Sequence, residues 1–118
     1  MKSRFKSKYK NVKTAGYDSK KESKRGKELA LLLRAGVIKE LEQQKVFVLQ
    51  DSFKARATKP PHKTETVRAI KYITDFYYYD CQRQEYVAED VKGFKTKDYL
   101  IKSKMFRKTY ENIVFIES

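Results

Sequence analysis

Residues 66–93 constrain this chain more than any other stretch, because they have the composition of two β-strands joined by a turn. Valine, isoleucine, tyrosine and phenylalanine dominate both arms, and these residues suit a pleated, half-buried surface. The turn is expected within residues 81–84. If the turn is centred between Gln82 and Arg83, the residue numbers of each pair of opposite residues add up to 165. Asp75 then lies directly opposite Asp90.

Two acids opposite each other in a sheet have Cβ atoms about 5 Å apart and destabilise it unless a cation lies between them. Lys92 follows Asp90 by two residues, so strand alternation returns its side chain to the same face. Two carboxylates and an ammonium group suit a hard divalent cation such as Mg²⁺. A register shifted by one residue would pair Asp75 with Glu89 instead, so the choice of acid stays open. A solvated strand face, with Asp90 and Lys92 as a surface pair, also explains the pattern.

The 118-residue chain carries 28 Lys and Arg against 15 Asp and Glu, a net charge of +13. This length predicts one small domain, and the charge predicts a polyanionic partner, either nucleic acid or an anionic membrane. No apolar run approaches the roughly 18 residues of a membrane span, and no long amphipathic basic helix favours a membrane surface. A single cysteine, Cys81, cannot form an internal disulfide, which suits a cytoplasmic protein. Together with the single histidine, His62, it cannot complete a tetrahedral zinc site.

Two basic segments are expected to lie outside the regular structure. Residues 1–14 hold six basic residues and no acid, which predicts a flexible arm in front of a domain spanning residues 15–118. Residues 51–66 contain two prolines and are predicted to form a loop that contacts DNA. A solubilising tail and an inert linker are the respective alternatives. The candidate phosphate-binding residues of these segments are Lys6, Lys8, Lys10, Lys54, Arg56 and Lys59.

A helix is predicted to begin at Ser19, because the sequence from Ser19 to Glu22 matches the S-x-x-E capping box, and to end at Gly36. At about 100° per residue, Glu22 falls on the same face as Gly26 and Leu29. Its carboxylate therefore points along the buried stripe, where it could join a metal cluster. A glutamate that only caps the helix is the alternative.

The remaining elements follow from shorter patterns. Residues 37–44 are predicted to form a turn or a short helical segment, and residues 46–49 a strand. Gln44 lies between them as either a neutral polar residue or an amide that lines a site. Thr96 is expected to cap a final helix, and residues 113–116 to form the last strand. The exposed stripe expected on this helix, a candidate for phosphate contact, consists of Lys97, Lys104 and Lys108.

This order of helix, three strands, helix and strand resembles the core of the PD-(D/E)XK nuclease superfamily. The likeness implies an α/β (α+β), restriction-endonuclease-like αβββαβ fold, with a central mixed sheet flanked by helices. The chain looks most similar to a phage-encoded family of Holliday-junction-resolvase-like endonucleases, over roughly residues 8–118. Thr74 stands where the literal motif has proline. The matching segments are DSKKE (18–22), Gly36 to Ile38 with Gln44, TDF (74–76) and EDVKGFKTKDY (89–99).

The resemblance implies hydrolysis of DNA phosphodiester bonds with Mg²⁺ or Mn²⁺. The implied metal-binding and catalytic groups are Asp75, Asp90, the Val91 backbone carbonyl, Lys92 and Glu22. Glu89 is the alternative third acid. We therefore expect a structure-selective endonuclease for branched or flapped DNA, phage-derived, active in the cytoplasm of a bacterial host, and paired as a homodimer like relatives of this size. The alternatives are a non-catalytic nucleic-acid-binding module with a nuclease-like fold, and a structural or anti-host interaction protein.

Overall fold

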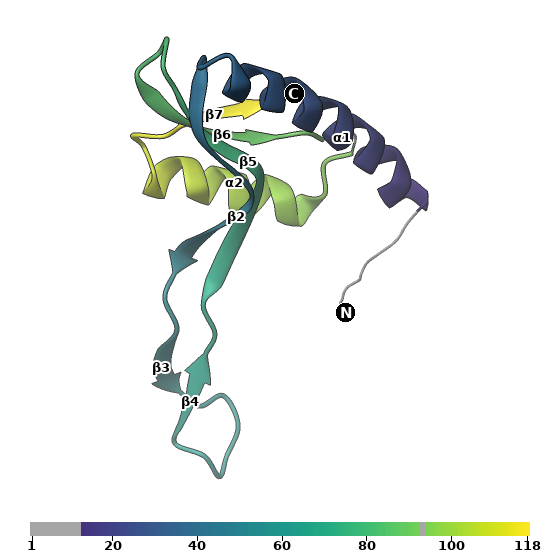
Figure 1. Ribbon diagram of the computed structural model, residues 1–118. Coiled ribbons are helices and arrows are strands. Elements are labelled where there is room, and N and C mark those ends of the chain that lie inside the picture. Colours follow the sequence, from purple (N-terminus) through teal and green to yellow (C-terminus); the bar gives the residue numbers. More distant parts are fainter. Residues whose placement is uncertain (1–12, 93) are drawn as a thin grey trace.

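The computed structural model describes residues 13–92 and 94–118 (Figure 1). A four-stranded sheet lies between two helices, and a separate two-stranded hairpin projects from it. In chain order the elements are α1 (Lys13–Arg34), β2 (Ile38–Gln50), β3 (Phe53–Arg56), β4 (Thr64–Val67), β5 (Ile70–Asp80), β6 (Glu85–Asp90), α2 (Lys97–Thr109) and β7 (Val114–Glu117). None of the helices in this described part of the chain has the length and apolar character needed to span a membrane.

The sheet has the strand order β2-β5-β6-β7, in which the first three strands are antiparallel and β7 runs parallel to β6. Without the β3–β4 hairpin, the element order is αβββαβ. The predicted fold class is thus confirmed: the protein is α+β, with a mixed central sheet and a helix on each side.

The register of the central hairpin is the predicted one. Phe76 pairs with Glu89 and Tyr77 with Ala88, so paired positions add up to 165. This register continues to Asp75 and Asp90, which lie opposite each other just beyond the last backbone pair. The alternative register, which pairs Asp75 with Glu89, is wrong.

Each helix covers its own hydrophobic cluster, on opposite faces of the sheet. Strand alternation sends Val87 and Ala88, neighbours on β6, into different clusters. The cluster under α1 contains Leu29, Ile38, Phe76, Tyr78, Val87 and Val91. The cluster under α2 contains Phe47, Tyr72, Ala88, Tyr99 and Phe106.

The helix ends agree only in part with the sequence. At the end of α1, the Gly36 N–H donates to the Leu33 carbonyl (3.1 Å) and the Val37 N–H to the Leu32 carbonyl (2.9 Å). Gly36 has φ 81°, which closes a Schellman motif as expected. The start is different, because α1 already runs from Lys13, so Ser19 lies inside the helix rather than capping it.

Helix α2 and strand β7 follow their predictions. Thr96 caps α2, and its side chain accepts the Tyr99 N–H at 3.0 Å. Strand β7, at Val114–Glu117, closely matches the predicted last strand at residues 113–116.

The turn or short helix predicted for residues 37–44 is wrong, because all of this segment except Val37 belongs to the long strand β2 (Ile38–Gln50). Its lysine, glutamate, leucine and glutamine favour a helix locally, but pairing with β5 over most of the strand overrides that preference. Two residues inside β2 have positive φ, Glu40 at 54° and Gln44 at 55°. A register shift between Lys39 and Glu42 accompanies the first of them. These irregularities hide the simple alternation by which a strand is recognised in a sequence.

The loop predicted for residues 51–66 contains the paired strands β3 and β4, in register from Phe53 with Val67 to Arg56 with Thr64. We call residues 53–67 the hairpin arm. It projects from the body of the protein (Figure 1). The two prolines lie in the turn that joins its strands, where no ladder hydrogen bonds are needed.

Candidate functional site

The two aspartates lie where the backbone ladder between β5 and β6 ends, and their side chains replace it. The Asp75 N–H donates to Asp90 Oδ1 (3.0 Å), and the Val91 N–H donates to Asp75 Oδ2 (2.8 Å). All three residues are buried; Asp75 is 8% exposed and Asp90 is fully buried. Each carboxylate is therefore held by a backbone donor of the opposite strand, so the side chains of the two acids are fixed relative to each other.

Asp90 is held from the α2 side as well. The Tyr72 hydroxyl, which lies in the cluster under α2, donates to Asp90 Oδ2. Burial raises the pKa of Asp90, and the positive charge of Lys92 works against that shift. The Asp75 N–H, which donates to Asp90, also works against the shift.

Gln44 joins an acid of α1 to an acid of β5. Its Nε2 donates to Glu22 Oε2 (3.1 Å) and to Asp75 Oδ1 (3.5 Å). Its φ of 55° is one that a non-glycine residue adopts at a cost of about 1 kcal/mol or more. The sequence left the role of Gln44 open, and the structure places its amide between two of the candidate acids.

Lys92 completes the group. Its Nζ lies 4.9 Å from the centroid of the Tyr99 ring, and the Tyr99 hydroxyl donates to Glu117. The positive charge of Lys92 opposes the upward shift in the pKa of both Glu22 and Asp90. We call Glu22, Asp75, Asp90 and Lys92 the acidic cluster, and these are the four side chains that the sequence singled out.

The electrostatics of the cluster are most visible at Glu22. Burial first, and the negative charge of Asp75 second, raise the pKa of Glu22 to about 7. The Lys92 charge and the hydrogen bond from Gln44 reduce this shift without abolishing it. Burial and the neighbouring negative charges therefore outweigh the stabilisation that Lys92 and Gln44 give to the Glu22 carboxylate.

We expect Glu22→Gln to stabilise the protein at pH 8. A folded-state pKa of about 7, above the ordinary value of 4.5, means that the wild type loses stability as the pH rises from 4.5 to 7. A glutamine does not titrate and avoids this loss. After allowance for the partial solvent exposure of Glu22, the gain at pH 8 should be about 1–2 kcal/mol. Urea denaturation at pH 4.5 and pH 8 measures it.

The control for this experiment is Glu111→Gln, at an exposed glutamate after α2. It should leave the pH dependence of unfolding as in the wild type. Adding Mg²⁺ at pH 8 should stabilise the wild type more than Glu22→Gln, if the cation relieves repulsion among the acids. An identical pH dependence in the wild type and Glu22→Gln would contradict the electrostatic account.

The donors of the cluster fit a hard divalent cation in their chemistry. Carboxylate oxygens are the ligands that Mg²⁺ prefers, and a cation would oppose both burial and the charge of Asp75, the two main causes that raise the pKa of Glu22. Within residues 13–92 and 94–118, no group of three or more His, Cys, Asp or Glu side chains closes around a metal position. The oxygens of Asp75 and Asp90 described above accept N–H and O–H donors of the protein itself.

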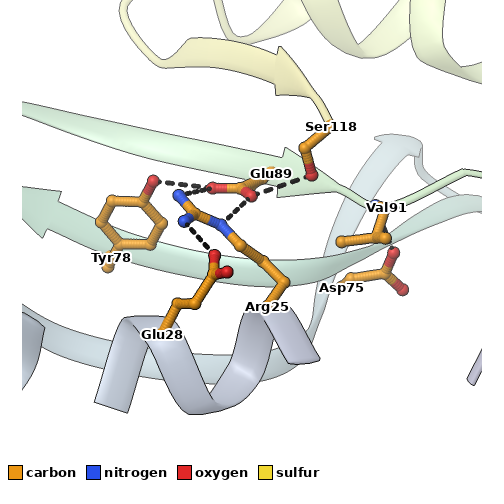
Figure 2. A network of polar contacts seen from close by, with 7 residues as sticks. All are labelled: Arg25, Glu28, Asp75, Tyr78, Glu89, Val91 and Ser118. Carbon is orange, nitrogen blue, oxygen red and sulfur yellow. Dashed lines mark hydrogen bonds and ion pairs between the residues drawn. The ribbon is translucent and has the colours of Figure 1, made fainter. Parts of the chain in front are cut away.

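Glu89 belongs to a different network, shown in Figure 2. It is fully buried, and Arg25 binds it through Nε (2.5 Å) and Nη2 (3.1 Å). The hydroxyls of Tyr78 (2.8 Å) and Ser118 (3.0 Å) also donate to it. Arg25 in turn contacts the exposed Glu28 at 3.0 Å. The segment EDVK thus contains two acids with different partners. Glu89 connects the sheet to α1 through Arg25, whereas Asp90 lies opposite Asp75.

Sequence reasoning missed Arg25. The only available signal was a basic residue one turn after Glu22, and in a chain with 28 Lys and Arg that signal is too common to use. The pairing with Glu89 spans 64 positions and depends on the packing of α1 over β6.

The candidate DNA-contacting residues fall in separate parts of the chain. Lys6, Lys8 and Lys10 lie outside the described residues, and the last two positions of the predicted N-terminal arm, residues 13 and 14, belong to α1. The others are all solvent-exposed, either on the hairpin arm or on α2. They are Lys54, Arg56, Lys59, Lys97, Lys104 and Lys108.

Comparison with known proteins places the chain in a family. No curated protein and no solved structure matches the chain. A family model described as "Protein of unknown function (DUF1064)" matches residues 2–116, a range that includes the acidic cluster, the hairpin arm and both helices. The chain therefore belongs to the DUF1064 family.

Proposed function

We propose that this protein is a metal-dependent DNA endonuclease of the PD-(D/E)XK type. The observation that carries the proposal is the acidic cluster: Asp75 and Asp90 cross-bonded at the end of the hairpin ladder, with Lys92 and Glu22 beside them. It lies in a chain with a net charge of +13, which suits a polyanionic substrate.

In this proposal, the acids of the cluster bind the metal ion and the lysine stabilises negative charge in the reaction. Asp75, Asp90, the Val91 carbonyl and Glu22 would hold a Mg²⁺ or Mn²⁺ ion. When bound, such an ion supplies polarisation of a phosphoryl oxygen and a lower pKa for a bound water. The Lys92 ammonium group stabilises the attacking hydroxide or the charge that develops on the phosphorane.

Two neighbours keep these groups in place. The Tyr99 ring lies against the Lys92 ammonium group, a cation–π contact that restricts where the amine can point. The Gln44 amide, bonded to both Glu22 and Asp75, sets the spacing between the helix acid and the strand acid. Neither residue needs to contact the substrate for this role.

Substrate selection in this proposal depends on backbone and shape. The exposed lysines and arginine of the hairpin arm and α2 contact phosphates, which positions DNA without reading its sequence. We propose branched or flapped DNA as the substrate, in the cytoplasm of a bacterial host that carries phage-derived DNA. Two copies of the chain would bring two sites to the two strands of such a substrate.

The test is a cleavage panel with the purified full-length protein. Four-way junction, flap, linear duplex and single-stranded DNA are each incubated with Mg²⁺, with Mn²⁺ or with EDTA. We expect cleavage of the branched or flapped substrates with either metal and none with EDTA. A non-catalytic nucleic-acid-binding module instead predicts binding that EDTA does not affect, with no substrate cleaved under any condition. That second outcome would reject the endonuclease.

A further inference from the structure

An open pocket of about 500 Å³ lies beside the acidic cluster, between α1 and the strands β2 and β5. We call it the α1 pocket. It has an apolar floor and a polar rim, and Glu22 belongs to both the pocket and the acidic cluster. Its lining includes Glu22, Ser23, Gly26, Ala30, Gln43 and Phe76.

The apolar floor of the pocket consists of two small residues of α1, Gly26 and Ala30, with the buried Phe76 beneath them (1% exposed). Gly26 lies against the Phe76 ring, and a Cβ added there would stand 3.4 Å from Phe76 Cζ. Ala30, one turn further along α1, is exposed and adds only a methyl group. A larger residue at the exposed Ala30 would occupy the pocket, whereas a side chain at Gly26 would press against the buried Phe76 ring.

The rim supplies hydrogen-bonding groups of several kinds. Gln43 contributes an amide with donors and an acceptor, Ser23 a hydroxyl and Lys27 a cation. An apolar floor with a few polar groups around its edge suits a planar heteroaromatic ring, which needs contact on its face and partners at its edges. The volume lies within the roughly 300–1,000 Å³ of small-molecule pockets.

The pocket is continuous with the proposed active site. Glu22 lines it and accepts a hydrogen bond from Gln44, the residue that follows the pocket residue Gln43 on β2. A nucleotide whose phosphate lay at the acidic cluster would therefore have the pocket next to it. We propose that the α1 pocket takes one unpaired nucleobase from the nucleotide beside the scissile phosphate, an inference that rests on the proposed nuclease function.

This site would explain selection for branched DNA without contacts to base edges in a groove. A paired base must be unstacked to enter the pocket, at a cost of a few kcal/mol, whereas a flap or branch point already offers unpaired bases. The pocket thus discriminates between substrates by the availability of a free base rather than by its identity.

The first test is Ala30→Met in the full-length protein, compared with Ala35→Met. Methionine is a good helix former, and Ala30 is exposed, so the change fills the pocket without entering the core. Ala35 is also exposed but does not line the pocket. We expect Ala30→Met to lower flap cleavage by about tenfold or more, with little change in affinity for duplex DNA, and Ala35→Met to leave both unchanged.

The second test measures the base directly. Flap DNA carrying 2-aminopurine at the unpaired position beside the branch is bound to the Lys92→Ala protein, and the fluorescence change on binding is compared with and without Ala30→Met. We expect the change to disappear in the double variant. Gln43→Ala, on a different element, gives a second disruption of the pocket in case Ala30→Met does not fold.

The outcomes separate the two proposals. If the wild type cleaves flaps and both Ala30→Met and Gln43→Ala cleave them equally well, the pocket inference is overturned while the nuclease stands. If the wild type cleaves nothing, the nuclease proposal fails. If the fluorescence change on binding is the same with and without Ala30→Met, and also with and without Gln43→Ala, the pocket inference is overturned whether or not cleavage occurs.

Discussion

Asp75→Asn or Lys92→Ala should abolish cleavage of branched DNA while binding of that DNA survives. Each substitution removes a charge from the acidic cluster, and loss of one such electrostatic contribution typically lowers kcat by about 10²–10³-fold or more. Asparagine can still accept the Val91 N–H that Asp75 accepts at 2.8 Å, so the fold should be retained. Cleavage rates and binding isotherms for the same junction and flap substrates measure the two effects separately.

The matched control is Lys39→Ala, at an exposed lysine of β2. It removes the same charge as Lys92→Ala but is not part of the acidic cluster, so cleavage should stay within about twofold of the wild type. Undiminished cleavage in both Asp75→Asn and Lys92→Ala would reject the assigned site. Loss of binding together with cleavage would instead mean that the substitutions disrupt the fold.

Glu89→Ala should have the largest effect on stability. The Glu89 side chain is fully buried and accepts four hydrogen bonds, from Arg25, Tyr78 and Ser118. The substitution breaks the ion pair with Arg25, leaves a cavity and removes the acceptor of the buried Tyr78 hydroxyl, so we expect a cost of about 3–5 kcal/mol. Since small domains are stable by only about 5–15 kcal/mol, the variant should be largely unfolded at moderate urea concentrations.

Glu28→Ala is the comparison within the same network. Glu28 contacts the same guanidinium group at 3.0 Å, but its side chain is 49% exposed. Its loss should cost under about 1 kcal/mol, as for other surface ion pairs. Urea denaturation at pH 7 gives both values. Equal losses in the two variants would show that the contact of Glu89 with Arg25 does not anchor α1 to the sheet.

The central hairpin could be predicted from the sequence because its geometry is local. Side chains in a strand alternate with a period of two, and a centred turn then fixes every pair, including Asp75 with Asp90. The same local rules located the end of α1 at Gly36 and the cap of α2 at Thr96. Since Asp75 and Asp90 lie on the hairpin and Lys92 follows it by two residues, most of the candidate site could be named before the structure.

What the sequence could not supply depends on contacts between distant segments. Residues 38–44 favour a helix by composition, and only their pairing with β5 makes them a strand. The pairing of Arg25 with Glu89 requires α1 to lie over β6. The amide of Gln44 reaches both Glu22 and Asp75 from a left-handed residue inside β2, and no propensity indicates such a conformation at a glutamine.

The hairpin arm adds little to the folded core. Among the described residues, both hydrophobic clusters draw on other elements only, and a two-stranded hairpin is at best marginally stable by itself in water. Its presence gives the molecule a long axis of 60 Å, a length that corresponds to about 18 base pairs of duplex at 3.4 Å per base pair. Footprinting on a long-armed substrate should therefore show protection well beyond the nucleotides next to the cut, extended toward one side.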